Sequence, residues 1–312
     1  MKMPFLPAAP SNMDISDKIK GIKERKRITV FAHNYQIPEV QESADVLGDS
    51  LELAKISTQL DARIIVLCGV KFMAETVKIL SPQKKVLLPV TDAGCPLADT
   101  ITPDQLLELK NKYPDAWVIS YVNTSASIKS LSDVCCTSAN AVKVVRNVPV
   151  KQVIFIPDKN LGWWVKKNVP EKDIILWDGT CYVHDRFNLK ELLDARKKFS
   201  DAEIIVHPEC PSEVLEHADF VCSTSGMLSR AKESQAKRFI IGTEVGLIHR
   251  LKKQNPRKEF YSLGSVKVCS NMKKITLNEL CFSLENEVNS VEISQDVRKN
   301  ALKALEAMMK YV

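Results

Sequence analysis

The chain has 312 residues, of which 45% are hydrophobic and 26% are charged, and its formal net charge is +6. This hydrophobic content is typical of a globular protein, and no apolar run approaches the roughly 20 residues of a membrane span. The basic residues are scattered without interleaved aromatic side chains, so we expect neither a nucleic-acid partner nor a membrane partner. The N-terminal segment does not resemble a signal or transit peptide, which predicts a cytoplasmic protein.

The first predicted unit begins with an apolar strand over residues 28–32 that ends at His33. Its further elements are a helix over 51–60, a strand over 63–68, a helix over 72–80 and a strand over 86–89. A turn containing Cys95 follows the last strand. Short β-branched runs that alternate with helical patterns indicate parallel strands buried on both faces.

The same order of elements returns twice. The second unit has strands over 116–120, 152–156 and 173–177, helices over 139–146 and 161–167, and then Cys181. The third has strands over 203–206, 238–241 and 259–262, helices over 226–236 and 245–253, and then Cys269. A capping box that starts at Thr276 and an apolar stripe that ends at Met308 predict two more helices.

The three units align without gaps. Asp133 follows Asp45 by 88 residues and Asp219 follows Asp133 by 86, and we expect these aspartates to tie loops within each unit. We therefore predict an α/β fold of three pseudo-threefold-related repeats, each a small parallel sheet flanked by helices in a three-layer αβα arrangement. The active site is expected at their centre. The expected domains are residues 1–100, 101–188 and 189–275, with the C-terminal helices of 276–312 packing on the first.

Three of the nine cysteines occupy the same position in each repeat. Cys95, Cys181 and Cys269 lie in turns, whereas Cys68 and Cys281 have the apolar neighbours of core residues. Three thiolates suit a soft metal centre. They leave a [4Fe–4S] cluster one ligand short of its usual four, so that one iron would be open as a Lewis acid. Zinc with three thiolates and a water molecule is the competing interpretation.

Polar residues follow the predicted strands and helix starts. Hydroxyl residues stand at equivalent helix starts, where we expect N-caps and, if the three helices converge, an anion site: Ser50, Ser138 and Thr224. The residues after the first strand of each repeat differ, which suggests different groups for one asymmetric substrate: His33 and Tyr35, Tyr121 and Asn123, His207 and Glu209. Glu209 is the natural general base, and His184 lies near the metal position three residues after Cys181.

Several blocks of the sequence, in order over residues 28–285, resemble the quinolinate synthase family: FAHNYQ, GDSLELA, AGCPLAD, CTSANA, GTCYVH, VHPECP and CSNMKKITL. The resemblance implies a [4Fe–4S] cluster held by Cys95, Cys181 and Cys269. It implies a transferase-type condensation with dehydration, in which iminoaspartate and dihydroxyacetone phosphate give quinolinate, phosphate and water for NAD biosynthesis. An aspartate-oxidising enzyme is a possible functional partner, because it would supply the iminoaspartate.

The resemblance also assigns residues. Acid/base and catalytic positions fall on Tyr35, Glu209 and His207. Substrate-binding positions fall on His33, Ser50, Tyr121, Asn123, Ser138, His184, His207, Glu209 and Thr224. Two other interpretations remain open. One is a lyase of the aconitase type with an open-iron cluster, and the other is a non-catalytic anion-binding or metal-sensing protein. The diverged strand ends argue against the second, because a sensor would not need acid/base groups from separate repeats.

Overall fold

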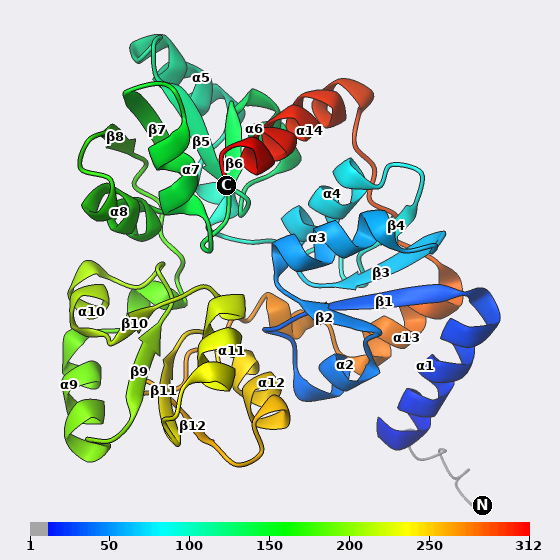
Figure 1. Cartoon of the computed structure of the whole chain (residues 1–312). Helices are drawn as coiled ribbons and strands as arrows, with labels where there is room; N and C mark the ends of the chain where they lie inside the picture. The colour runs from blue at the N-terminus through cyan, green and yellow to red at the C-terminus, as the bar shows by residue number, and fades with distance from the viewer. Residues whose placement is uncertain (1–11) are drawn as a thin grey trace, which may run out of the picture.

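The computed structural model describes residues 12–312, whose strands form three four-stranded sheets in which all neighbouring strands are parallel (Figure 1). In each sheet the second strand lies at one edge, followed by the first, the third and the fourth. This repeated order confirms the predicted fold of three small parallel sheets flanked by helices. The strands are β1 (Ile28–His33), β2 (Val46–Gly48), β3 (Ile64–Cys68) and β4 (Lys85–Leu87); β5 (Trp117–Tyr121), β6 (Val134–Cys136), β7 (Gln152–Ile156) and β8 (Asp173–Leu176); and β9 (Glu203–Val206), β10 (Phe220–Val221), β11 (Arg238–Gly242) and β12 (Glu259–Ser262).

Helices connect the strands, and each repeat contains more of them than the sequence predicted. The first repeat has α1 (Asn12–Lys26), α2 (Pro38–Ser43), α3 (Ser50–Gln59) and α4 (Lys71–Leu80). The second has α5 (Pro103–Lys112), α6 (Ala126–Leu131), α7 (Ala141–Asn147) and α8 (Lys159–Asn168). The third has α9 (Leu189–Lys198), α10 (Ser212–His217), α11 (Thr224–Glu233) and α12 (Gly246–Gln254). The tail forms α13 (Leu277–Asn286) and α14 (Gln295–Lys310).

The first strand of each repeat is tied by the aspartate that the repeat keeps. The Asp45 carboxylate accepts the backbone N–H of Val30 at 2.8 Å. In the other two repeats, Asp133 and Asp219 accept the equivalent backbone N–H groups, at 2.7 and 2.8 Å. These bonds fix the edge strand beside the first strand, as expected for loop-tying residues, and none of the three aspartates lines the central cavity.

The C-terminal helices pack on two different repeats. The capping box predicted at Thr276 is present, and α13 lies against α1 and β3 of the first repeat. In contrast, α14 lies along α6 and β6 and buries Ala301, Leu305 and Met308 in the core of the second repeat (Figure 1). α14 was expected on the first repeat; it packs mainly on the second repeat and contacts α4 of the first repeat as well. The apolar stripe of α14 was recognisable in the sequence, but it did not specify which sheet the stripe would cover.

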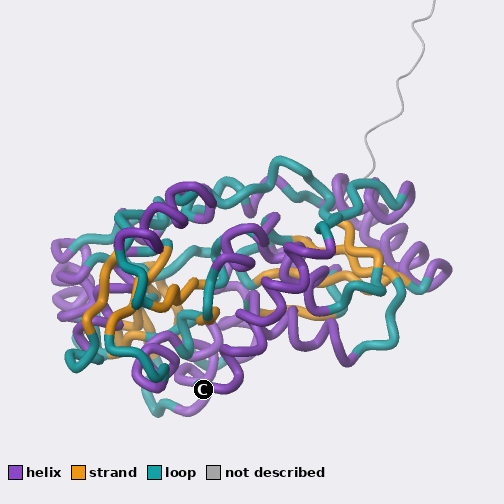
Figure 2. Tube along the Cα trace, turned by 90° about the horizontal axis from the view of Figure 1, so that it is seen from above, coloured by secondary structure: helices purple, strands orange, loops and turns teal. Residues whose placement is uncertain are grey.

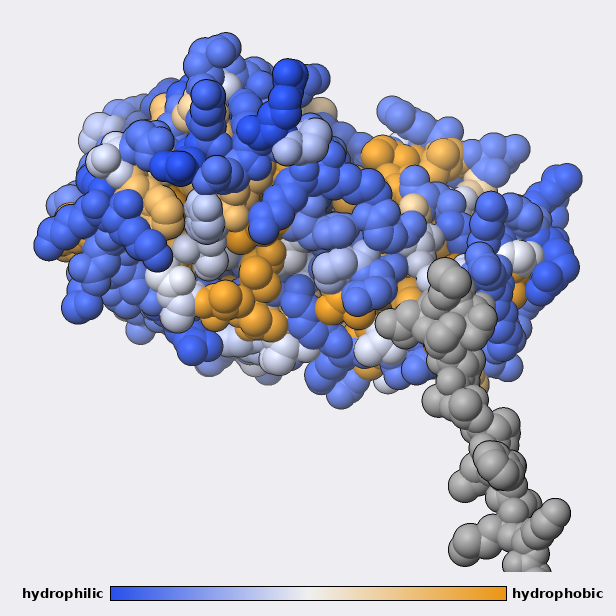
Figure 3. Space-filling model, turned by 90° about the horizontal axis from the view of Figure 1, so that it is seen from below, coloured by the Kyte–Doolittle hydropathy of each residue, from blue (hydrophilic) through white to orange (hydrophobic). Residues whose placement is uncertain are grey.

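The molecule is broad and comparatively thin when seen from above, with strands inside and helices outside (Figure 2). On the face seen from below, separate apolar areas lie within a largely hydrophilic surface (Figure 3). Within residues 12–312, no helix combines the length and the apolar character needed to cross a lipid bilayer.

Candidate active site

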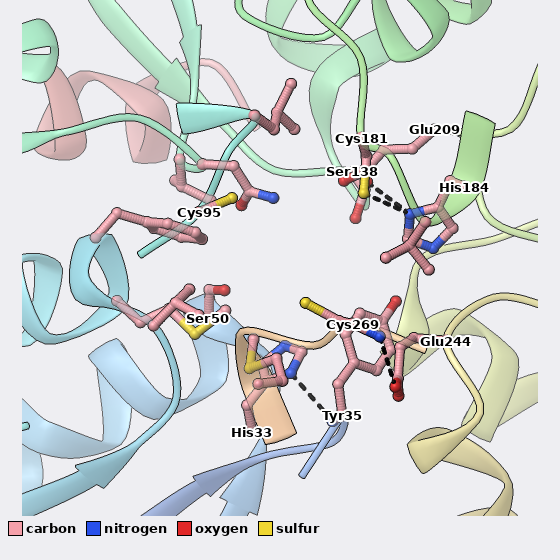
Figure 4. Close-up of a pocket in the computed structure, with 18 of the residues that line it drawn as sticks. His33, Tyr35, Ser50, Cys95, Ser138, Cys181, His184, Glu209, Glu244 and Cys269 are labelled. Carbon is pink, nitrogen blue, oxygen red and sulfur yellow. Dashed lines mark hydrogen bonds and ion pairs between the residues drawn. The ribbon is translucent and has the colours of Figure 1, made fainter. Parts of the chain in front are cut away.

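The carboxyl ends of the first strands meet at one cavity in the middle of the molecule (Figure 4). Ligand crevices of parallel sheets lie at this end of the strands. The cavity has about 800 Å³ of empty space, its mouth to solvent included. All thirteen predicted site residues line it: His33, Tyr35, Ser50, Cys95, Tyr121, Asn123, Ser138, Cys181, His184, His207, Glu209, Thr224 and Cys269.

The three cysteine loops have the same local structure. Each follows the last strand of its repeat and leads into a short 3₁₀ turn: Ala98–Thr100, His184–Arg186 or Met272–Lys274. Each loop is also fixed to the segment after the third strand by a backbone hydrogen bond: Lys71 N–H to Ala93 O at 2.9 Å, Lys159 N–H to Gly179 O at 2.8 Å, and Val245 N–H to Lys267 O at 3.1 Å. The repeats therefore present three equivalent thiols to one cavity.

These three thiols are free and half-buried. Burial raises the pKa of the Cys95 thiol to about 12 and raises the pKa values of Cys181 and Cys269 as well. A metal would therefore have to displace their protons on binding.

The three hydroxyl residues line the cavity but do not cap the helices, so the N-cap expectation is wrong. Asp49, one residue before Ser50, accepts the backbone N–H groups of α3. Ser223, one residue before Thr224, does the same for α11. In the second repeat α7 begins only at Ala141, after a turn. The hydroxyls of Ser50, Ser138 and Thr224 therefore do not serve as helix caps.

Two histidines at equivalent strand ends are held in the same way. Nδ1 of His33 accepts the backbone N–H of Tyr35 at 3.1 Å, and Nδ1 of His207 accepts that of Glu209 at 3.4 Å. Burial lowers the pKa of His33 to about 4 and that of His207 to about 3, so both rings are neutral at pH 7. In a neutral ring whose Nδ1 accepts, Nε2 carries the proton. Each histidine therefore has one N–H donor free for a ligand.

A chain of hydrogen bonds links Glu209 to Tyr35 across the site. Glu209 is only 2% exposed; its Oε2 lies 2.8 Å from His184 Nδ1, and its Oε1 accepts the Tyr121 hydroxyl at 2.7 Å. His184 Nε2 lies 2.7 Å from Thr243 Oγ1, which in turn lies 2.6 Å from the Tyr35 hydroxyl. Because a carboxylate only accepts, His184 Nδ1 carries its proton and a neutral ring accepts at Nε2. The chain therefore runs from the Tyr35 phenol through Thr243 and His184 to Glu209.

The two ends of this hydrogen-bond chain differ in their protonation at neutral pH. Burial raises the pKa of Tyr35 well above its ordinary value, and the Glu209 charge adds to that effect. Burial also acts to raise the pKa of Glu209, but the electrostatic interaction with the His184 and His207 imidazoles and the hydrogen bonds from His184 and Tyr121 outweigh it and hold that pKa low. At neutral pH the site thus holds a protonated phenol at one end and a carboxylate at the other, with an imidazole between them.

Three residues of the site were missed in the sequence. Thr243 completes the hydrogen-bond chain, and the buried carboxylates of Asp158 and Glu244 accept the backbone N–H groups of Cys181 and Cys269. All three stand just after the third strand of their repeat, and Glu244 follows Asp158 by the same 86 residues that separate the aligned aspartates. That spacing was the available signal.

Two groups of side chains can hold a metal. Cys181 Sγ, His184 Nδ1 and a Glu209 oxygen all lie within 4.8 Å of one another. Within the described residues, the three repeat-equivalent sulfurs are not so tightly grouped, although they line the same cavity (Figure 4). The first group is already satisfied internally, because His184 Nδ1 lies 3.3 Å from Cys181 Sγ and 2.8 Å from Glu209.

Comparison with known proteins shows to which family the chain belongs. The model of the family described as "Quinolinate synthetase A protein" matches residues 17–310. The chain belongs to this family. Its relatives named quinolinate synthase include that of Alkaliphilus metalliredigens, with 52% identity over 94% of this chain and 97% of the relative. Those of Thermodesulfovibrio yellowstonii and Caldicellulosiruptor saccharolyticus share 49% and 51% identity, over 94% and 95% of this chain and 97% of each relative.

Family membership agrees with the geometry. The match spans all three sheets and both C-terminal helices, so every residue that lines the cavity falls inside it. The resemblance inferred from the sequence motifs is thereby confirmed.

Proposed function

We propose that the protein is a quinolinate synthase that condenses iminoaspartate with dihydroxyacetone phosphate and releases phosphate and water. The observation that carries this proposal is the meeting, in one cavity, of three equivalent thiols with the chain from Tyr35 to Glu209. Thiols alone would suit a metal store or sensor. Acid/base groups from all three repeats around the same space indicate a reaction that moves several protons.

The donor set fits a [4Fe–4S] cluster better than a single zinc ion. At a Zn–S distance of about 2.3 Å, tetrahedral zinc needs sulfur atoms within about 3.8 Å of one another. The sulfurs of Cys95, Cys181 and Cys269 do not all fall within 4.8 Å in the described chain. A cluster binds each thiolate through a different iron and accepts such a wider triangle. When bound by three cysteines, a cluster supplies one iron that lacks a protein ligand and can act as a Lewis acid.

The cavity supplies donors for the anionic groups of the two substrates. His33 and His207 each offer a neutral Nε2–H, and Ser50, Ser138 and Thr224 offer hydroxyls that no helix start consumes. Asn123 adds an amide at the end of the second repeat's first strand. Neutral donors can bind carboxylate and phosphate oxygens without the desolvation cost of buried cations. We assign substrate binding to these residues together with Tyr121 and His184.

Proton transfer is assigned to the hydrogen-bond chain. The Tyr35 phenol can give its proton to a leaving hydroxyl group, because its raised pKa keeps it protonated at neutral pH. The proton is replaced through Thr243 from His184 once that ring has taken up a second proton, and the resulting imidazolium faces the Glu209 carboxylate 2.8 Å away. In the opposite direction, Tyr35 passes a proton to His184 and becomes a base. We assign catalytic roles in the condensation and the dehydration to Glu209 and His207 together with Tyr35.

The proposal is tested with protein purified without oxygen. We expect about four iron and four sulfide per chain and quinolinate formation from dihydroxyacetone phosphate and iminoaspartate, the latter generated by an aspartate-oxidising enzyme. Cys95→Ala should abolish both the iron–sulfur absorbance and activity. The matched control is Cys68→Ala, because Cys68 is fully buried in β3 away from the cavity.

Colourless protein with one zinc per chain would refute the cluster. Iron–sulfur protein that turns over a hydroxy acid but not iminoaspartate, as judged by mass spectrometry, would indicate the aconitase-type alternative.

A further inference from the structure

In the second and third repeats, a fully buried carboxylate contacts the backbone of the cysteine that faces the cavity. Asp158 and Glu244 are both 0% exposed. Asp158 Oδ2 accepts the backbone N–H of Cys181 at 3.2 Å, and Glu244 Oε1 accepts that of Cys269 at 3.1 Å (Figure 4 labels Glu244 beside Cys269). A carboxylate is costly to bury unless its oxygens are paired, so these are specific contacts and not incidental ones.

The second oxygen of each carboxylate is used in an equivalent way. Asp158 Oδ1 accepts the backbone N–H of Leu161 at 2.7 Å, at the start of α8. Glu244 Oε2 accepts that of Gly246 at 2.7 Å, at the start of α12. Each carboxylate therefore joins a rigid helix start to a cysteine loop. Because the backbone orientation of a residue sets the direction of its Cα–Cβ bond, this junction also sets where the sulfur points.

The first repeat lacks this junction. The aligned position is Val70, which precedes Asp158 by 88 residues and has no side-chain acceptor. Here the cysteine loop is held differently: the Asn271 amide donates to Gly94 O at 2.8 Å. The three thiols are equivalent in position, but only two of them have a carboxylate behind them.

We propose that Asp158 and Glu244 are positioning residues that hold Cys181 and Cys269 in the orientation that binds the metal centre, whereas the Cys95 loop is held through the Asn271 amide. The inference rests on the proposed function, because it assigns these cysteines to a cluster. Replacing either carboxylate leaves the cysteine N–H without its acceptor, and replacing Glu244 also removes the carboxylate partner of Lys273 Nζ, 2.9 Å from Glu244 Oε1, so we expect the loop to shift. Outer partners of metal ligands typically contribute about 10- to 100-fold to metal affinity.

The test uses the full-length, cluster-loaded protein and replaces each carboxylate by valine, the residue at the aligned position of the first repeat. We expect Asp158→Val and Glu244→Val to release iron to a chelator at least about 10-fold faster than the unmodified protein. Asp158→Asn should lie in between, because its amide keeps one acceptor oxygen. The electron paramagnetic resonance spectrum of the reduced cluster should change in Asp158→Asn, which reports on the ligand geometry itself.

The matched control is Asp133→Val. Asp133 also accepts a backbone N–H within the second repeat, but that of Val118 in a strand and not that of a cysteine. It should lower the unfolding midpoint and leave the iron-release rate within twofold and the spectrum unchanged. The proposal is overturned if the Asp158 and Glu244 variants release iron at the unmodified rate, or if the control accelerates release equally.

If the valine variants do not fold, Asp158→Asn and Glu244→Gln decide by the same two measurements, and unchanged rates and spectra in both overturn the proposal. Unmodified protein that binds no iron would instead refute the proposed function, on which this inference depends.

Discussion

Replacing Thr243 by valine tests whether the hydrogen-bond chain carries protons or only supports the fold. Thr243 Oγ1 lies 2.6 Å from the Tyr35 hydroxyl and 2.7 Å from His184 Nε2, and no other group joins these two side chains in the described structure. Valine has nearly the same shape and no hydroxyl. Thr243→Val therefore breaks the chain at one atom and leaves the packing of the site in place.

The loss of stability and the loss of kcat distinguish a structural role of the chain from a role in proton transfer. Thr243→Val leaves two buried polar groups without a partner, which should lower the free energy of unfolding by about 1–3 kcal/mol for each group. If the chain also delivers protons to the reaction, kcat should fall by about 10²- to 10⁴-fold, which corresponds to about 3–5 kcal/mol of activation free energy. Because Thr243 does not itself line the cavity, KM should change little.

The assay is anaerobic quinolinate formation at saturating substrates, with iron content matched between proteins. Thr243→Ser keeps the hydroxyl and should retain kcat within a few-fold of the unmodified protein. If Thr243→Val and Thr243→Ser have the same kcat, the chain supports the structure and does not move protons. The role assigned to Thr243 would then be wrong.

Two further changes test the electrostatics of the cavity and the packing of the tail. Burial lowers the pKa of His33 to about 4 from its ordinary 6.5, so between these pH values the unfolded chain binds a proton that the folded chain does not, and stability falls as the pH is lowered. The free energy of unfolding should be about 2 kcal/mol lower at pH 5 than at pH 7, as measured by denaturant titration at each pH. His33→Gln should remove this part of the pH dependence. The same pH dependence in the variant and the unmodified protein would contradict the lowered pKa. Leu305→Ala on α14 should lower the free energy of unfolding by about 2–5 kcal/mol, because Leu305 is buried in the core of the second repeat. The partly buried Leu302 is the control for Leu305, and its alanine variant should cost less.

The central strands and the cysteine loops were predictable because their signals are local. Strands β3, β7 and β11 are continuous apolar runs, and each cysteine follows the last strand of its repeat. The edge strands β2, β6 and β10 were missed, since two or three residues are too few for a periodic pattern.

The connecting helices α5 and α9 were also missed, although each begins with a recognisable cap. Thr102 forms a capping box with Gln105, and Asn188 accepts the backbone N–H of Glu191. These two helices lie between the repeated blocks of the sequence, so the repeat does not mark them. The location of α14 could not be predicted, because an apolar stripe specifies a buried face but not the partner that covers it.

Thr243 and the two buried carboxylates reveal that the repeats diverge at a second set of positions. Divergence was predicted only after the first strand, at His33, Tyr121 and His207. The two residues after the third strand diverge as well, from Gly69-Val70 to Pro157-Asp158 to Thr243-Glu244. The first repeat places no polar side chain there, the second places one anchor for its cysteine loop, and the third places both an anchor and the hydroxyl of the hydrogen-bond chain.

This second set of positions lies between the two kinds of chemistry in the cavity. Its residues reach back to the cysteine loops through Asp158 and Glu244 and across to Tyr35 through Thr243. A change there can therefore be directed at a cysteine loop, through Asp158 or Glu244, or at the hydrogen-bond chain, through Thr243. The three repeats present equivalent thiols, but the residues after the third strand anchor only the Cys181 and Cys269 loops through a carboxylate.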